Sequence, residues 1–165
     1  MAIREIRKQG DPVLEKVCKP VKEMTPRLSD LVDDMLETMY DANGVGLAAP
    51  QVGVLRRIVV IDVGEGPYVL INPEITERDG EQTGQEGCLS VPGVYGIVTR
   101  PEHVKAKALD KDMKPYEIDA EGLFARAVCH ELDHLDGKMY TSLVEDGLHS
   151  YDEQDDDEEI GRAHV

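Results

Sequence analysis

Tryptophan is absent from this chain of 165 residues, and aromatic residues make up only 4% of it, so a folded core must be largely aliphatic. Long apolar runs are missing as well, because no stretch approaches the roughly 20 residues that a transmembrane helix needs. The first residues also lack the apolar segment of a secretory signal peptide. These absences predict a cytoplasmic protein that is neither exported nor embedded in a membrane.

Cysteine is scarce too, with Cys18, Cys88 and Cys129 as its three occurrences. An odd number at irregular spacing does not form a disulfide framework. The natural compartment for such a chain is the reducing cytoplasm, where a cysteine matters as a metal ligand or a nucleophile.

Positive charge is in short supply: 18 basic residues face 34 acidic ones, for a net charge of −16. This balance argues against a DNA-binding surface. The block DEQDDDEE at residues 152–159 concentrates acidic charge near the C-terminus, and like-charge blocks of this kind are typical of solvated, disordered tails. We therefore predict a single domain over residues 1–149 and a disordered acidic tail over residues 150–165.

Hydrophobic residues make up 41% of the chain, enough for one globular domain with its own core. Apolar residues at helical spacing predict a first helix over residues 25–43 and a second over residues 122–134, which carries the sequence HELDH. Segments rich in β-branched residues, or alternating in polarity, predict strands. These segments are residues 56–64, 67–76, 103–110 and 116–122.

Two stretches fit neither pattern. Residues 44–53 are too short and too often interrupted by glycine for a helix, and residues 83–101 are turn-rich at first and extended only later. Because strands do not alternate regularly with helices, we predict an α+β fold. Mostly antiparallel sheets should pack around the central helix that bears HELDH, with an N-terminal helix before them and the short acidic tail after them.

The sequence HELDH at residues 130–134 has the pattern His-Glu-x-x-His. Positions i and i+4 of a helix differ by about 40° around its axis, so His130 and His134 can share a metal ion. The alternative interpretation has no metal: two histidines lie on the helix surface and the glutamate stands between them by chance. A catalytic metal site needs a third protein ligand.

Three places could supply that ligand. A histidine further along the chain is ruled out, since Tyr140 stands at its position. Glu153 or Glu158 would lie in the acidic tail, with no helix to hold it. Cys88 is favoured, because a thiolate with two imidazoles is an established catalytic set that leaves one position open, and Gly87 before it permits a close backbone approach.

Three segments together resemble the signature motifs of peptide deformylases, in the family's order and at similar spacing. They are GVGLAAPQVG at residues 44–53, EGCLS at residues 86–90 and HELDH at residues 130–134. The likeness runs from about residue 3 to about residue 143, although Cys129 stands where many members have glutamine.

The resemblance implies an enzyme that removes the N-formyl group from nascent bacterial proteins. It implies one divalent metal ion held by Cys88, His130 and His134, with ferrous iron in the cell and zinc, nickel or cobalt as replacements in purified protein. It also implies formyl-methionyl nascent peptides as partners, with transient ribosome association. The acidic net charge and the lack of a long apolar run predict no binding to DNA or membranes.

Hydrolysis of a formamide needs an activated water and a stabilised oxyanion. Glu131, between the two histidines, can accept a proton from the attacking water and deliver it to the departing nitrogen. The side-chain amide of Gln51 and the backbone N–H of Leu89 are candidate oxyanion donors, and both roles match what the resemblance implies.

The resemblance also implies that substrate lies extended beside Gly46 and the segment from Gly87 to Leu89. Helix geometry predicts a pocket for the methionine side chain, because Ala127 and Leu123 precede His130 by one and two turns. Val45 could close the far wall of this pocket.

The same helix geometry turns Asp133 toward the metal side. Its expected partner is Arg100, and the alternative is an Asp133 exposed to solvent.

Two other functions remain open from the residues alone. A zinc endopeptidase with the same pattern would need a third ligand after the helix. A structural metal module would need a fourth protein ligand, and Glu131 would then have no task.

Overall fold

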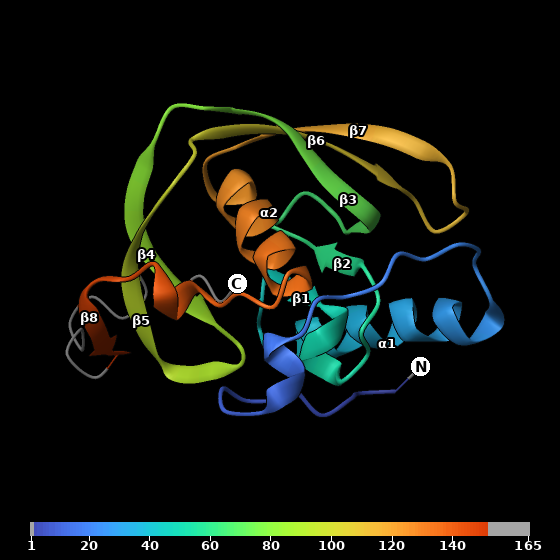
Figure 1. Ribbon diagram of the computed structural model, residues 1–165, viewed down its shortest axis with the longest axis horizontal. Helices are drawn as coiled ribbons and strands as arrows, with labels where there is room; N and C mark the ends of the chain where they lie inside the picture. Colours follow the sequence, from blue (N-terminus) through green and yellow to red (C-terminus); the bar gives the residue numbers. More distant parts are fainter. Residues whose placement is uncertain (1, 152–165) are drawn as a thin grey trace.

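The computed structural model describes residues 2–151, which form two antiparallel sheets, two α-helices and short 3-10 turns (Figure 1). The predicted tail lies outside these residues from position 152 onward. The helical elements are η1 (Pro12–Glu15), α1 (Pro26–Asp41), η2 (Ala49–Val52), α2 (Gly122–Leu135) and η3 (Tyr140–Ser142). The strands are β1 (Gly46–Ala48), β2 (Ile58–Ile61), β3 (Tyr68–Asp79), β4 (Gln82–Cys88), β5 (Val91–Arg100), β6 (His103–Leu109), β7 (Pro115–Glu121) and β8 (Glu145–Ser150).

The strands divide into a five-stranded sheet with the order β1-β2-β3-β6-β7 and a three-stranded sheet with the order β4-β5-β8. Every pairing between these strands is antiparallel. The prediction of a mixed fold with antiparallel sheets is therefore confirmed. No helix in the described part of the chain is long and apolar enough to cross a bilayer.

Helix α1 begins with local signals that the sequence supplies. The Thr25 side chain accepts a hydrogen bond from the N–H of Leu28 at 3.2 Å, and Pro26 occupies the first helical position, where its missing N–H costs nothing. One face of α1 is buried against β1 and β2. The buried residues of this cluster include Leu31, Val32, Met35, Met39, Leu47 and Ile58.

Helix α2 follows β7 without a loop, and the change of direction falls on Gly122, whose φ of 58° suits glycine. In Figure 1 the helix lies inside the fold, with β6 and β7 above it and β4 and β5 beside it. Its apolar side packs into a second cluster with the five-stranded sheet. This cluster includes Ala125, Val128, Leu132, Val59, Ile61, Ala106 and Ile118.

The stretch expected to be turn-rich forms a regular hairpin instead. β4 and β5 pair from Gln82 with Arg100 to Gly87 with Tyr95, and the register shifts before Cys88. The extended second half was expected and is β5, but the turn-rich first half was wrong because these glycines do not all mark turns. At Gly96 an added Cβ would lie 2.4 Å from the Val144 side chain, so this glycine permits close packing within a strand.

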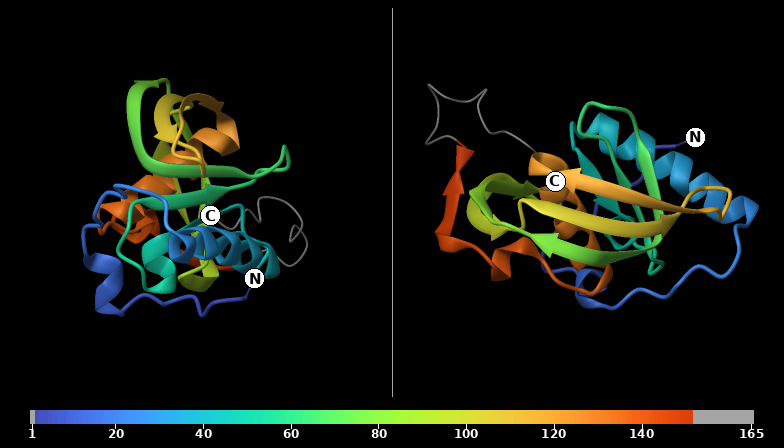
Figure 2. Two further views of the ribbon diagram at one scale, coloured as in Figure 1. Left: turned by 90° about the vertical axis from the view of Figure 1, so that its right-hand side faces the viewer. Right: turned by 90° about the horizontal axis from the view of Figure 1, so that it is seen from above.

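The C-terminal part of the described chain is held by β8, which pairs with β5 and ends at Ser150. Tyr151 is buried and its ring centroid lies 5.2 Å from that of Tyr95. The described fold thus continues past residue 149, where the predicted domain ends. Figure 2 shows β8 at the opposite end of the molecule from the start of α1.

Candidate metal centre and active site

Three buried side chains from two elements converge at the centre of the fold. Cys88 is the last residue of β4, while His130 and His134 lie one turn apart on α2. Cys88 Sγ lies 3.4 Å from His134 Nε2, which lies 3.2 Å from His130 Nε2. One ligand atom from each of the three residues lies within 4.8 Å of the others. The structure therefore brings together the three predicted ligands as a candidate metal site.

The chemistry around these atoms fits a cation. Burial lowers the pKa of His130, but the charges of Glu86, Glu131 and Cys88 outweigh it and raise the pKa well above its ordinary value. Burial and the charge of His130 lower the pKa of His134 well below its ordinary value. The negative potential that favours a proton on His130 also favours a metal ion there. The neutral imidazole of His134 is a suitable second ligand.

Glu86 is a buried carboxylate behind His130 that sequence analysis did not single out. Its Oε2 lies 2.6 Å from His130 Nδ1, and it forms ion pairs with Arg100 at 2.6 Å and Arg126 at 2.8 Å. Burial would raise the pKa of Glu86, but His130 and Arg100 hold it well below its ordinary value. Glu86 is therefore ionised and orients the imidazole, as partners of metal-binding histidines commonly do.

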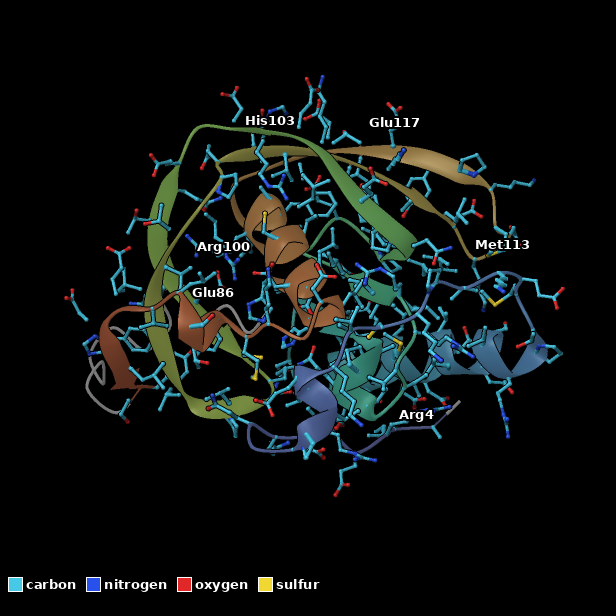
Figure 3. The ribbon with its side chains drawn as sticks, viewed as in Figure 1. Arg4, Glu86, Arg100, His103, Met113 and Glu117 are labelled. Carbon is cyan, nitrogen blue, oxygen red and sulfur yellow. The ribbon has the colours of Figure 1, made fainter. Side chains whose placement is uncertain are left out.

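Arg100 also donates to Asp133 Oδ2 at 2.8 Å, which confirms the predicted partnership. In Figure 3 Glu86 and Arg100 lie side by side between the β4–β5 hairpin and α2. Spacing could have revealed the rest of this network. Glu86 precedes Cys88 by two positions on a strand, and Arg126 precedes His130 by four on a helix, so each shares a face with a predicted ligand.

Glu131 lies beside the three ligands, with its Oε2 4.0 Å from His130 Nε2. Both of its carboxylate oxygens are buried without a hydrogen-bond partner, a costly state unless another group completes the site. Burial raises the pKa of Glu131 to about 7. A carboxylate with this pKa is suited to accept and return a proton near neutral pH.

Gly46 of β1 explains how that carboxylate fits. A Cβ added to Gly46 would lie 2.6 Å from Glu131 Oε2 and 2.9 Å from its Cγ. The sequence suggested that this glycine makes room for substrate. In the structure its missing side chain also makes room for Glu131.

Gln51 reaches the site from η2, and both ends of its side-chain amide are held. Its Oε1 accepts a hydrogen bond from the N–H of Ala48 at 2.9 Å, and its Nε2 lies 3.0 Å from Ser90 Oγ and 3.7 Å from Cys88 Sγ. The NH₂ group is therefore aimed at the metal side. Leu89 follows Cys88 directly in the chain.

A cavity of about 270 Å³ opens beside the site, and Cys88, Leu89 and the β5 residues Val91 to Val94 line it together with Ile6, Lys8 and Ala42. The residues predicted to hold the methionine side chain do not line this cavity. Ala127 is buried and Val45 packs against the same apolar cluster, whereas Leu123 is 38% exposed at the start of α2. Gly87 lies in β4, next to Cys88.

A buried thiol and two imidazoles in reach of one ion, with an unpaired carboxylate beside them, define a metal-dependent hydrolase. Comparison with known proteins agrees. Residues 3–147 match the family described as polypeptide deformylase. A peptide deformylase of Agathobacter rectalis is 66% identical over 158 residues, which cover 96% of this chain and 100% of that protein.

Solved structures give the same result. A peptide deformylase from Legionella pneumophila is 48% identical with a TM-score of 0.84, covering 87% of both chains. One from Synechococcus elongatus in complex with actinonin is 44% identical with a TM-score of 0.84, covering 87% of this chain and 79% of that one. The chain belongs to the polypeptide deformylase family, and it is a hydrolase that acts on formyl-methionyl peptides.

Proposed function

We propose that this chain removes the formyl group from formyl-methionyl nascent proteins and releases formate, using one divalent metal ion held by Cys88, His130 and His134. The single observation that carries this proposal is the convergence of three buried ligand atoms within 4.8 Å. Membership of the deformylase family supports the substrate class. The solved relative with actinonin supports a ligand-binding site in the same fold.

When bound, the metal supplies Lewis acidity that polarises the formyl carbonyl and makes a water easier to ionise. We propose that the metal is ferrous iron in the cell, with zinc, nickel or cobalt as replacements in purified protein. A thiolate with two imidazoles accepts all four of these metals, since it combines soft and borderline donors.

Glu131 moves the proton in this proposal. Its unpaired oxygens and its pKa of about 7 allow it to take a proton from the attacking water. The same carboxyl group then returns the proton to the departing nitrogen, which becomes the free amine of methionine. Gly46 keeps the space that Glu131 occupies.

Gln51 and Leu89 stabilise the oxyanion that forms on the former formyl oxygen. Ala48 and Ser90 fix the Gln51 amide. The second N–H of its NH₂ group, which lies toward Cys88 Sγ at 3.7 Å, is therefore already aimed at the reaction centre. The backbone N–H of Leu89 is the second donor, and it follows the cysteine ligand directly.

The substrate lies extended beside Gly46 and Gly87, on β1 and β4. These two strands end their respective sheets, and the edge of a sheet can pair with an added strand. Val45, Ala127 and Leu123 form the pocket for the methionine side chain, with Leu123 at its exposed rim.

The alternative functions fit the described residues less well. An endopeptidase with this pattern would take its third ligand after α2, whereas Cys88 comes before it. A closed structural site uses four protein ligands, and the ligand group found in residues 2–151 has three.

The finer organisation belongs to the same proposal. The two sheets pack around α2 as the metal-bearing helix, and the catalytic domain predicted for residues 1–149 extends through the end of β8 to Tyr151. The acidic residues from position 152 onward take no part in catalysis. We place the protein in the cytoplasm, with transient ribosome association and without binding to DNA or membranes.

The direct test is formate release from a formyl-methionyl peptide by protein loaded anaerobically with ferrous iron. An acetyl-methionyl peptide is the matched control for the acyl group, and an internal-cleavage assay tests for endopeptidase activity. Formate release from the formyl peptide alone supports the proposal. Cleavage of internal peptide bonds, or bound metal without formate release, would contradict it.

A further inference from the structure

Arg126 is a buried cation that the reaction does not use directly. It lies on α2, one turn before His130, and is 4% exposed. Its Nη1 donates to Glu86 Oε1 at 2.8 Å and to the carbonyl oxygen of Val98 at 3.1 Å. A buried guanidinium is costly unless it is paired. The pairing of Arg126 with Glu86 is therefore expected to matter for the site.

The hydrogen bonds of Glu86 can be counted atom by atom. Its Oε1 accepts from Arg100 Nε at 3.1 Å and from Arg126 Nη1 at 2.8 Å. Its Oε2 accepts from Arg100 Nη2 at 2.6 Å and lies 2.6 Å from His130 Nδ1. A carboxylate offers about four lone-pair positions, so all of them are occupied. The group cannot rotate without breaking a charged hydrogen bond.

This arrangement fixes His130. An ionised carboxylate only accepts, so Nδ1 of His130 carries the hydrogen and the lone pair of a neutral ring lies on Nε2. That atom faces His134 Nε2 at 3.2 Å. We propose that Arg126 is a positioning residue that acts through Glu86 to set the tautomer and ring orientation of His130 for metal binding. This inference rests on the proposed function, because it takes His130 as a ligand.

Arg100 cannot replace Arg126 in this role. Its Nε and Nη2 already bind Glu86, and its Nη1 binds Asp133 at 2.8 Å. The two arginines also balance the charges of Glu86 and Asp133. Without Arg126 the cluster behind His130 would hold a buried excess of negative charge and an unfilled acceptor on Glu86.

The first test uses Arg126→Met, which removes both hydrogen bonds, and Arg126→Lys, which keeps the charge without the planar fork. Arg27→Met is the control, because Arg27 is exposed on α1. Titration of metal-free protein with cobalt should show about 10–100-fold weaker binding for Arg126→Met, the usual cost of losing a partner behind a ligand. Arg126→Lys should recover part of this loss, and Arg27→Met should match wild type.

The second test separates action through Glu86 from a general effect on folding. In a Glu86→Gln background, Arg126→Met should weaken cobalt binding by about twofold or less, because the group through which it acts is already altered. An equal loss in both backgrounds would show that Arg126 supports only the fold and would overturn the inference. Affinity of Arg126→Met within about twofold of wild type, in the wild-type background, would overturn it as well.

The third test needs neither metal nor a stable variant. Nitrogen NMR of the His130 ring in the metal-free wild-type protein should show a hydrogen on Nδ1 that is protected from exchange. A neutral ring protonated on Nε2 instead would contradict the inference. Failure of the wild-type protein to bind metal or release formate would instead overturn the proposed function, so the two failures remain distinct.

Discussion

The two sheets of this protein bury different chemistry. The five-stranded sheet faces the core with aliphatic side chains such as Val59, Ile61 and Ile118. The hairpin of the three-stranded sheet instead buries Glu86, Cys88 and Arg100. Apolar burial is non-directional and tolerates many arrangements, whereas each buried polar group needs a particular partner. The first sheet therefore supplies stability, and the second depends on exact partners from α2.

Helix α2 connects the two sheets by presenting a different side to each. Ala125, Val128 and Leu132 belong to the apolar cluster of the five-stranded sheet. Arg126 and His130 bond with the hairpin of the other sheet. Packing on one side thus holds the helix while hydrogen bonds on the other align it, and substitutions in the two regions should have separable effects.

The largest effect is expected for Cys88→Ala. Loss of the sulfur leaves two imidazoles, so tight metal binding and formate release should both be abolished while the fold survives. The matched control is Cys129→Ala, since Cys129 is also buried but belongs to the apolar cluster. Metal analysis and peptide kinetics measure the difference. One bound metal with full activity in Cys88→Ala would show that the third ligand is another residue.

The second largest effect is expected for Glu131→Gln. The amide cannot accept a proton, so kcat should fall by about 10²–10⁴-fold, while one equivalent of metal stays bound. Glu131→Asp is the matched variant, because it keeps the carboxylate at a shorter reach. An unimpaired rate for Glu131→Gln at saturating formyl peptide would remove Glu131 from the mechanism.

Gln51→Ala removes an oxyanion donor from the same region. The expected loss is roughly 3 kcal/mol in transition-state binding, seen in kcat with little change in KM. Ser90→Ala serves as a partial variant, because it removes one of the two contacts that hold the amide. A pure KM effect in Gln51→Ala would make Gln51 a substrate-positioning residue instead.

Ile71→Ala tests the other side of the comparison. Ile71 is buried in β3 within the cluster that α1 covers, and its truncation should cost about 2–5 kcal/mol of unfolding free energy. Metal affinity and kcat should stay unchanged below the melting temperature. Denaturant unfolding with parallel cobalt titration measures both quantities. A large loss of metal affinity in the folded variant would show that the two sheets are not separable.

The same contrast explains what the sequence could predict. Alternation at Val104, Ala106 and Ala108 led directly to β6, because a strand with one buried face repeats every two residues. Cys88 could be chosen by ligand chemistry alone, and Asp133 with Arg100 by helix geometry. Glu86 and Arg126 were missed because their mutual contact spans 40 residues of sequence, and only their spacing from Cys88 and His130 points to it. β4 was missed because its glycines resemble turn residues, although close packing accounts for at least one in this hairpin.

The smallest effect is expected from removing residues 152–165, which lie outside the described part of the chain. This cut spares β8 and Tyr151, which packs against Tyr95 of β5. The removed segment carries most of the acidic excess near the C-terminus and contributes no ligand in our proposal. We expect metal content to be unchanged and kcat/KM for a short formyl peptide to stay within about tenfold of wild type, equivalent to roughly 1.4 kcal/mol.

A second truncation after residue 144 is the contrasting variant, because it also removes β8 and should lower the melting temperature. If the shorter cut alone reduces metal content or exceeds the tenfold limit, a tail carboxylate acts at the metal centre, and the assignment of three ligands from β4 and α2 must be revised.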